Sequence, residues 1–222
     1  KENIPYAIFV QNGYSIFPTN NNAKLNLAYK KCKFILSYSK DIRDCVSFAY
    51  PKEKKKIINV KYSIDFRKFK KTKKKNIITF MPRKLRHHSE LVISFLKNYL
   101  PKNWKIKPLV DLNEKEVYKN LAESKIFLAF SELEGLPLPP VEAAISGNKV
   151  IGYTGEGGKE YWKKPIFTEI KSSEIKNFCK EILLNLNLKD FLKKSSNQRK
   201  KLSNMFSPRE EHNAIIKFLK KI

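Results

Sequence analysis

The sequence has no long apolar run, and its cysteines are too few and too scattered to form a framework. No stretch approaches the roughly 20 consecutive apolar residues that a membrane-spanning helix needs. Cys32, Cys45 and Cys179 are odd in number, and their spacing is unlike that of metal ligands. We therefore expect buried, reduced thiols in a cytoplasmic protein, and neither a disulfide scaffold nor a cysteine-based metal site.

Arginine is also scarce, although the chain is strongly basic. The net charge is +25, but 40 of the 46 basic residues are lysines and only 6 are arginines. Proteins that read bases or hold phosphates with a fork favour arginine, and the lysines here are spread along the chain. We interpret most of the charge as a solvated surface that attracts anionic donors or an anionic membrane. A basic nucleic-acid-binding protein remains an alternative, and nucleic acid is not the partner that we expect.

What the sequence does contain is a regular alternation of short apolar strands and amphipathic segments. Its 222 residues are 41% hydrophobic, enough for one large or two small α/β domains. The pattern predicts strands at residues 6–10, 33–39, 56–60, 76–81, 104–110, 126–130 and 149–153. It predicts helices at residues 20–28, 41–49, 89–100, 113–122, 173–186 and 191–205, in an Ala-rich segment that ends at residue 147, and from residue 207 onward. This order implies parallel sheets with right-handed crossovers.

A basic segment with little apolar content, residues 66–75, interrupts the alternation, which then restarts. We interpret this segment as a linker or domain boundary. The predicted fold class is therefore α/β with Rossmann-like parallel sheets. The predicted domains are residues 1–70, which include the linker, and residues 71–222, which include the C-terminal helices.

The most informative stretch lies at residues 130–144, where two carboxylates, Glu134 and Glu142, bracket one glycine and three prolines. The stretch follows a predicted buried strand and leads into a helix, in whose first turn proline is favourable. We expect a stiff loop that directs free N–H groups and a helix N-terminus at the carboxyl edge of the sheet. Such an edge suits a phosphate and the hydroxyls of a sugar. Glu142 is predicted in the first helical turn, where it would also stabilise the helix dipole.

These residues resemble the nucleotide-sugar-dependent glycosyltransferases of the GT-B fold, specifically the large retaining group called family 4. Glu134 and Glu142 match the Glu-x7-Glu motif of that family. Residues 80–83 match the first strand of its donor domain with a phosphate-binding arginine. Residues 150–160 match the strand that follows the motif and its Gly-Gly-x-x-Glu turn, which is one residue shorter here, at residues 157–160. The resemblance covers nearly the whole chain.

The resemblance implies a GT-B fold with a whole donor domain from about residue 75 and only the last part of an acceptor domain up to about residue 65. Ser39, Asp65 and Phe69 match the end of the acceptor domain and the interdomain crossover. The glycine-rich acceptor loop of the family has no counterpart, and the sequence starts at Lys1. We therefore expect an N-terminally incomplete chain, which would bind donor but turn it over poorly.

The resemblance also implies roles for individual residues. Arg83 would bind the donor diphosphate and Glu134 the hydroxyls of the transferred sugar, and these two are the candidate catalytic residues. Glu142 would accept hydrogen bonds from the ribose hydroxyls. The other candidate donor-binding residues are Gly135, Leu136, Pro137, Leu138, Lys84, Glu156, Gly157 and Val110. The family commonly has a second phosphate-binding lysine where this chain has His88, so Lys84 or Arg86 would have to replace it.

The implied activity is transfer of a sugar from a nucleotide-sugar donor to a saccharide or lipid-linked acceptor in surface polysaccharide synthesis. We expect no cofactor and no metal, because side chains would meet the charge on the leaving diphosphate and the chain has no Asp-x-Asp motif. The expected location is the cytoplasm, with peripheral contact at the inner face of the membrane as a further expectation. The alternatives are a non-catalytic, nucleotide-binding GT-B remnant and a GT-B epimerase.

Overall fold

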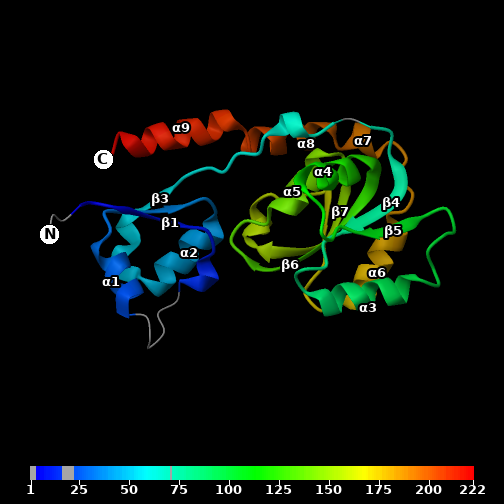
Figure 1. Cartoon of the computed structure of the whole chain (residues 1–222), viewed down its shortest axis with the longest axis horizontal. Coiled ribbons are helices and arrows are strands. Elements are labelled where there is room, and N and C mark those ends of the chain that lie inside the picture. The colour runs from blue at the N-terminus through cyan, green and yellow to red at the C-terminus, as the bar shows by residue number, and fades with distance from the viewer. Residues whose placement is uncertain (1–3, 17–22, 71) are drawn as a thin grey trace.

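Two parallel β-sheets, one after the other along the chain, form the frame of the molecule (Figure 1). The structure is a computed structural model, and it describes residues 4–16, 23–70 and 72–222. Across these residues the strand order is β1-β2-β3 in the first sheet and β5-β4-β6-β7-β8 in the second. Neighbouring strands pair in parallel in both sheets, as the alternating pattern predicted.

The first sheet and its helices form the N-terminal unit. Its strands are β1 (Ala7–Val10), β2 (Phe34–Ser37) and β3 (Ile57–Asn59). Its helices are η1 (Gly13–Ser15), α1 (Ala23–Lys31), α2 (Lys40–Ala49) and η2 (Pro51–Lys56), where η marks a 3-10 helix. Val10, Ile35 and Ile42 belong to a core between the sheet and these helices. The first three residues of the predicted helix at 20–28 lie outside the described part of the chain.

The second sheet and the helices around it form the C-terminal unit. Its strands are β4 (Lys75–Phe80), β5 (Lys105–Pro108), β6 (Ser124–Glu134), β7 (Lys149–Glu156) and β8 (Phe167–Glu169). Its helices are α3 (Arg86–Leu96), α4 (Glu114–Glu123), α5 (Leu138–Ile145), η4 (Gly157–Glu160), α6 (Ile175–Leu184), α7 (Phe191–Lys194) and α8 (Ser196–Met205). A short helix, η3 (Phe66–Lys68), lies in the segment between the two sheets.

Helices cover both faces of the second sheet, which explains the continuous apolar run in β6. Ile126, Leu128 and Phe130 point to the face that packs against α3 and α6. Phe127 and Ala129 point to the opposite face, against α4, α5 and α8. Successive side chains of a strand alternate between faces, so a strand that is buried on both sides is apolar throughout.

The strands that carry the candidate site are longer than predicted. The sequence predicted a loop directly after residue 130 and a turn from Thr154, but β6 continues to Glu134 and β7 to Glu156. Glu134 pairs with Glu156, with a register shift after Ser131. The apolar pattern ends where the core ends, whereas the backbone pairing continues past it, so the pattern could not show the extension.

Two further predictions were wrong in detail. The short strand β8 was not predicted, and the single helix expected at residues 191–205 is divided into α7 and α8 at Ser195. The Ser195 hydroxyl donates a hydrogen bond to the Phe191 carbonyl, 2.6 Å away. A serine hydroxyl bonded to a carbonyl four residues earlier often bends a helix, which accounts for the break.

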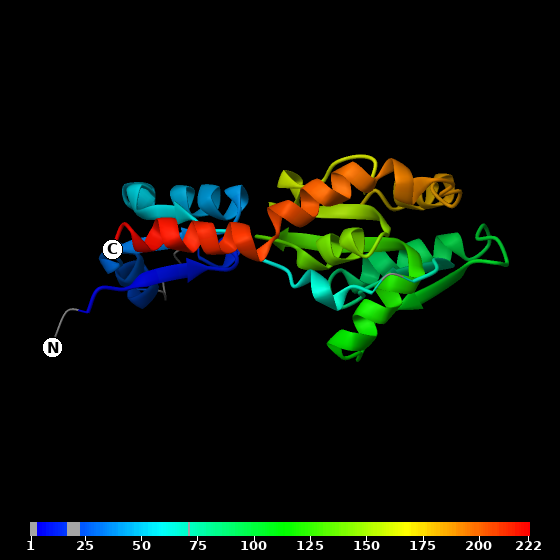
Figure 2. The same ribbon diagram turned by 90° about the horizontal axis from the view of Figure 1, so that it is seen from above.

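The last helix, α9 (Pro208–Leu219), returns to the N-terminal unit. Figures 1 and 2 both show it lying along that unit, away from the sheet that precedes it in sequence. The Phe218 ring meets the Phe34 ring edge-on at 5.5 Å, and Ser63 donates a hydrogen bond of 2.5 Å to Glu211. The chain therefore passes between the two units twice.

Two polar side chains join the carboxyl ends of α4 and α5. Asn148 is fully buried, and its Nδ2 donates to the carbonyls of Leu121 (2.8 Å) and Ala143 (2.9 Å). The Lys74 ammonium donates to the carbonyls of Leu121 (3.0 Å) and Ser146 (2.6 Å). The last carbonyls of a helix lack partners within the helix, and a cation is favourable there. These contacts fix α4 against α5.

We expect Asn148→Ala to lower the free energy of unfolding by about 2–3 kcal/mol, because it removes the buried hydrogen bonds of the side-chain amide with the Leu121 and Ala143 carbonyls and with the Ser124 hydroxyl. Asn177→Ala is the matched control, since Asn177 is exposed on α6 and bonds only a nearby side chain among the described residues. The control should change the value by less than about 0.5 kcal/mol. Urea unfolding monitored by circular dichroism measures both, and equal effects would contradict the role given to Asn148.

Candidate functional site

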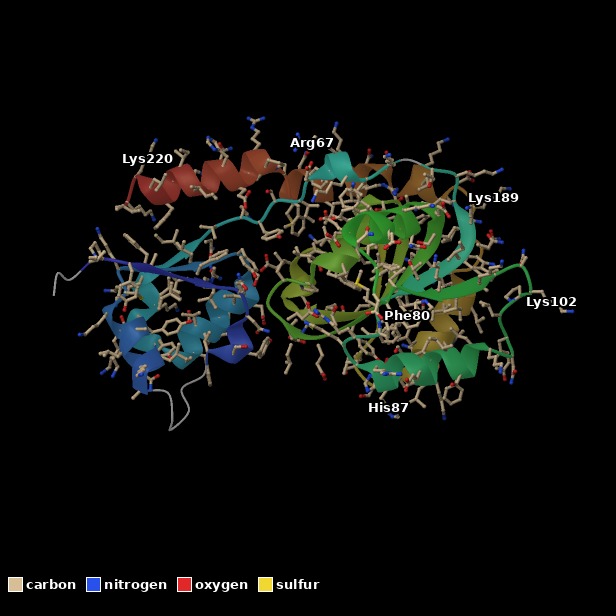
Figure 3. The ribbon with its side chains drawn as sticks, viewed as in Figure 1. Arg67, Phe80, His87, Lys102, Lys189 and Lys220 are labelled. Atoms are coloured by element: carbon tan, nitrogen blue, oxygen red, sulfur yellow. The ribbon has the colours of Figure 1, made fainter. Side chains whose placement is uncertain are left out.

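The candidate site lies at the carboxyl edge of the second sheet. Phe80 ends β4, Glu134 ends β6 and Glu156 ends β7, and Figure 3 shows Phe80 near the middle of the molecule. The carboxyl ends of parallel strands meet at one edge, and ligands of open α/β sheets bind in the crevice there. The sequence placed its candidate residues at this same edge.

A cation and a carboxylate face each other across the ends of β4 and β6. Lys84 Nζ is 2.6 Å from Glu134 Oε1, and the Glu134 side chain is only 17% exposed. Both residues line a small cavity of about 140 Å³ together with Arg83, Met81 and Pro139. The structure thus brings together three of the predicted site residues, Arg83, Lys84 and Glu134.

Arg83 also lines a second and larger cavity, about 590 Å³, beside α3 and the end of β5. Val110 lines this cavity too and is 48% exposed. Small-molecule sites commonly have volumes of roughly 300–1,000 Å³. Among the described residues no hydrogen bond or ion pair holds the Arg83 guanidinium. The group is therefore available to a ligand in either cavity.

His88 does not take part in this arrangement. Its Nδ1 lies 3.1 Å from the Tyr153 hydroxyl on β7, and its ring meets the Tyr153 ring edge-on. Arg86 pairs with Glu90 one turn along α3, at 2.8 Å, and His87 points outward (Figure 3). Of the cations considered for the second phosphate contact, Lys84 is the one that lies beside Arg83 and Glu134 in the smaller cavity.

Close backbone contacts fix the loop between β6 and α5. A Cβ atom on Gly135 would lie 2.6 Å from the Ile42 side chain and 2.9 Å from the Gln11 carbonyl oxygen, both in the N-terminal unit. A Cβ atom on Gly157 would lie 1.9 Å from the Gly135 carbonyl oxygen. Only glycine fits at either position without a shift of the backbone.

The side chains of Leu136 and Leu138 pack against the core on the α5 side of the sheet. Pro137 precedes α5, and its carbonyl accepts a hydrogen bond of 2.5 Å from the buried Tyr161 hydroxyl. At these three positions the side chains are therefore occupied by packing. The free backbone N–H groups of Leu136 and Leu138 are the parts that a ligand could use.

Glu142 lies on α5 but is not among the described residues that line the cavity of Glu134. It is the fifth residue of α5, so the prediction that it occupies the first turn was wrong: the helix begins at Leu138, ahead of the two prolines. Glu142 Oε1 is 3.3 Å from the Tyr118 hydroxyl on α4. Burial raises the pKa of Glu142, and the hydrogen bond from Tyr118 opposes that rise.

Glu156 and Gly157 lie where the N-terminal unit meets the second sheet. Glu156 pairs with Lys159 at 2.7 Å, and its charge contributes to a raised pKa of Asp41 on α2, which arises chiefly from burial. The Tyr14 hydroxyl donates to Asp41 at 2.9 Å. Glu156 is thus the register partner of Glu134 and lies near the N-terminal unit, and it is not among the described residues that line the cavity of Glu134.

Several residues around the site were not found from the sequence, namely Asn12, Tyr14, Asp41 and Tyr118. Asn12 donates to the Leu133 carbonyl at 3.1 Å, across the two units. Such contacts join segments far apart in sequence and leave no local pattern. Tyr118 follows Glu114 by four residues on α4, a spacing that places both on one helix face, and this was the one available signal.

No protein-family model matches the sequence, and no curated protein matches it. Solved structures do match. Staphylococcus aureus TarM, in complex with UDP, α-GlcNAc-glycerol and fondaparinux, has a TM-score of 0.70 and 16% identity over 97% of this chain and 50% of that chain. The pneumococcal O-GlcNAc transferase GtfA, in complex with UDP and GlcNAc, has a TM-score of 0.60 and 12% identity over 98% of this chain and 52% of that chain. Sucrose-phosphate synthase from Thermosynechococcus elongatus has a TM-score of 0.68 and 9% identity over 100% of this chain and 68% of that chain.

The chain has the GT-B fold. This confirms the predicted fold class, α/β with parallel sheets of the GT-B type. The chain spans about half the length of TarM and of GtfA. Among the described residues of this chain, no helix is long and apolar enough to cross a membrane. Within the same residues, no group of three or more His, Cys, Asp or Glu side chains is arranged so that it could hold a metal ion.

We predict that Glu134→Gln tightens the binding of inorganic pyrophosphate about fivefold, or about 1 kcal/mol, because it removes the negative charge beside Arg83 and Lys84. Glu132→Gln is the matched control, since it removes the same charge from an exposed residue two positions earlier. Isothermal titration calorimetry gives the dissociation constants. Weaker binding by Glu134→Gln, or the same change in both variants, would show that the two cations do not form an anion site.

Proposed function

We propose that this chain contains the donor-binding part of a glycosyltransferase that transfers a sugar from a nucleotide-sugar donor to a saccharide or lipid-linked acceptor. The observation that carries the proposal is the grouping of Arg83, Lys84 and Glu134 at the carboxyl edge of the second sheet of a GT-B fold. The UDP bound to TarM and to GtfA supports a nucleoside diphosphate as the leaving group.

In this proposal the two cations receive the diphosphate. The anomeric carbon of the sugar loses its bond to the diphosphate oxygen and gains one to an acceptor hydroxyl oxygen, whose proton is released. Arg83 and Lys84 stabilise the charge that develops on the leaving diphosphate. The proposal assigns this task to the side chains and not to a metal ion.

The carboxylates have separate tasks. Lys84 leaves Glu134 for the diphosphate, and the freed Glu134 accepts hydrogen bonds from hydroxyls of the transferred sugar. Glu142 accepts hydrogen bonds from the ribose hydroxyls. The N–H groups of Gly135, Leu136 and Leu138 face the sugar or the diphosphate, and Val110 flanks the base in the larger cavity.

Some parts of the proposal rest on the motif resemblance alone. They are membership of family 4 through the Glu-x7-Glu motif of Glu134 and Glu142, a retaining mechanism, and a role in surface polysaccharide synthesis. The same holds for a cytoplasmic location with peripheral membrane contact. Glu156 and Gly157 are proposed to border the transferred sugar through the turn that follows β7.

A non-catalytic nucleotide-binding protein with the same fold is the second candidate, because anion binding by Arg83 and Lys84 at the smaller cavity does not require turnover. Nucleic-acid binding has less support. The basic residues labelled in Figure 3, Arg67, Lys102, Lys189 and Lys220, lie far apart along the outline of the molecule in that view.

The proposal is tested by titrating the protein with UDP, GDP and ADP and with their glucose and N-acetylglucosamine derivatives. We expect at least one nucleotide to bind and to raise the melting temperature. Arg83→Ala and Glu142→Ala should each weaken its binding about tenfold or more, the value of a hydrogen bond to a charged group. Glu174→Ala, which removes an exposed carboxylate at the start of α6, serves as the control and should bind as the wild type does.

Failure of every nucleotide to bind, or binding by Arg83→Ala and Glu142→Ala as tight as that of the wild type, would refute the donor site. Release of free sugar or transfer to an added acceptor separates an enzyme from a binding protein. If the chain is an enzyme, Glu134→Gln should lower that rate while nucleoside diphosphate binding is retained. Binding without any turnover would favour the second candidate.

A further inference from the structure

Tyr118 lies between two carboxylates and has no role in the site described above. Its hydroxyl oxygen is 3.1 Å from Glu114 Oε1 and 3.3 Å from Glu142 Oε1. A tyrosine hydroxyl has a single hydrogen to donate. It can therefore satisfy one of the two carboxylates at a time.

The two carboxylates differ in how much they need that hydrogen. Glu114 is exposed, and Lys68 Nζ lies 2.8 Å from its Oε1. Glu142 is half-buried, and within the described part of the chain Tyr118 provides the one hydrogen bond recorded for its carboxylate. Because a buried carboxylate without a donor is costly, the hydrogen is worth more at Glu142. Lys68 pairs with Glu114 and so favours donation of the Tyr118 hydrogen to Glu142.

The ring of Tyr118 is held in place by the segment that joins the two sheets. The Phe69 ring packs edge-on against it at 4.7 Å, and Lys68 Nζ lies 6.0 Å from its centre. The contacts of Asn148 and Lys74 fix α4 against α5 from the other end. The distance between the Tyr118 hydroxyl and Glu142 is thus set by packing on several sides.

We propose that Tyr118 is a positioning residue for Glu142: it holds Oε1 of the carboxylate and leaves Oε2 for the ribose hydroxyls of a nucleoside diphosphate. Lys68 supports it by occupying Glu114. The identity of the ligand rests on the proposed function, whereas the hold of Tyr118 on Glu142 does not. In this arrangement the segment between the sheets forms part of the nucleotide site.

The charged and titratable groups that face Glu142 are Tyr118 and Glu114 on α4 and Lys68 at the end of η3. Burial raises the pKa of Glu142, and the Glu114 charge raises it further, while Tyr118 and Lys68 lower it. A carboxylate accepts two ribose hydroxyls only when it is ionised, so ribose binding weakens as the pH falls through this pKa. Loss of the Tyr118 hydroxyl should move that fall to higher pH.

The first experiment compares two probes, UDP and inorganic pyrophosphate, by calorimetry. We expect Tyr118→Phe to weaken UDP binding about tenfold, the loss expected for one hydrogen bond to a charged group, and to leave pyrophosphate binding unchanged. Glu114→Gln replaces the competing carboxylate with a neutral amide, whose oxygen is a weaker acceptor, and should tighten UDP binding. A tyrosine that merely supports packing would give no such gain. Tyr99→Phe, an exposed tyrosine beyond α3, is the matched control and should change neither probe.

The second experiment needs no ligand. The Glu142 carboxyl carbon is titrated by carbon-13 NMR in the free protein, with Glu142→Gln to assign its signal. We expect the midpoint to rise in Tyr118→Phe and to fall in Glu114→Gln. If the wild-type protein binds none of UDP, GDP and ADP, the proposed function and the ribose role are overturned, and the titration still decides whether Tyr118 holds Glu142.

Two results would overturn the positioning role itself while UDP binding by the wild type stands. One is a Tyr118→Phe variant with unchanged UDP affinity and an unchanged Glu142 midpoint. The other is equal weakening of UDP and pyrophosphate by this variant, because that pattern means general disturbance of the site and not the loss of a ribose contact.

Discussion

β6 and β7 remain paired beyond the apolar core, as far as Glu134 and Glu156, and this pairing determines where the charged groups of the site stand. The pairing leaves no space for a side chain where the Gly157 backbone passes the Gly135 carbonyl. Because β6 ends there in a fixed position, Lys84, which follows the neighbouring strand β4, can reach Glu134. The N-terminal unit contacts the same loop through Ile42, so both units set the position of the loop.

The excess of basic residues explains why most carboxylates near the site are paired with a lysine. With 46 basic and 21 acidic residues, a carboxylate near the site readily meets a lysine. Glu134 is paired with Lys84, Glu156 with Lys159 and Glu114 with Lys68. Glu142 differs from these three carboxylates and resembles Asp41, because a tyrosine hydroxyl donates to each of the two. Among the described residues, no ion pair therefore engages the Glu142 carboxylate.

The sequence predicted the parts of the fold whose side chains enter a core, because alternation and helical spacing report burial. The strands around Ile35, Ile78 and Phe127 were found for this reason, and the solved glycosyltransferase structures confirm the predicted fold class. The extension of β6 to Glu134 is held by backbone pairing, which no side-chain pattern reports. Tyr118 touches Glu142 across two helices and so leaves no local signal. The roles assigned to the site residues remain predictions.

The return of α9 to the N-terminal unit has a mechanical consequence. Two segments cross between the units, namely the one that contains η3 and the one that leads into α9 (Figure 1). Two crossings restrict the movement of one unit relative to the other more than a single crossing would. The hydrogen bond from Asn12 to the Leu133 carbonyl adds a further restraint between the facing edges.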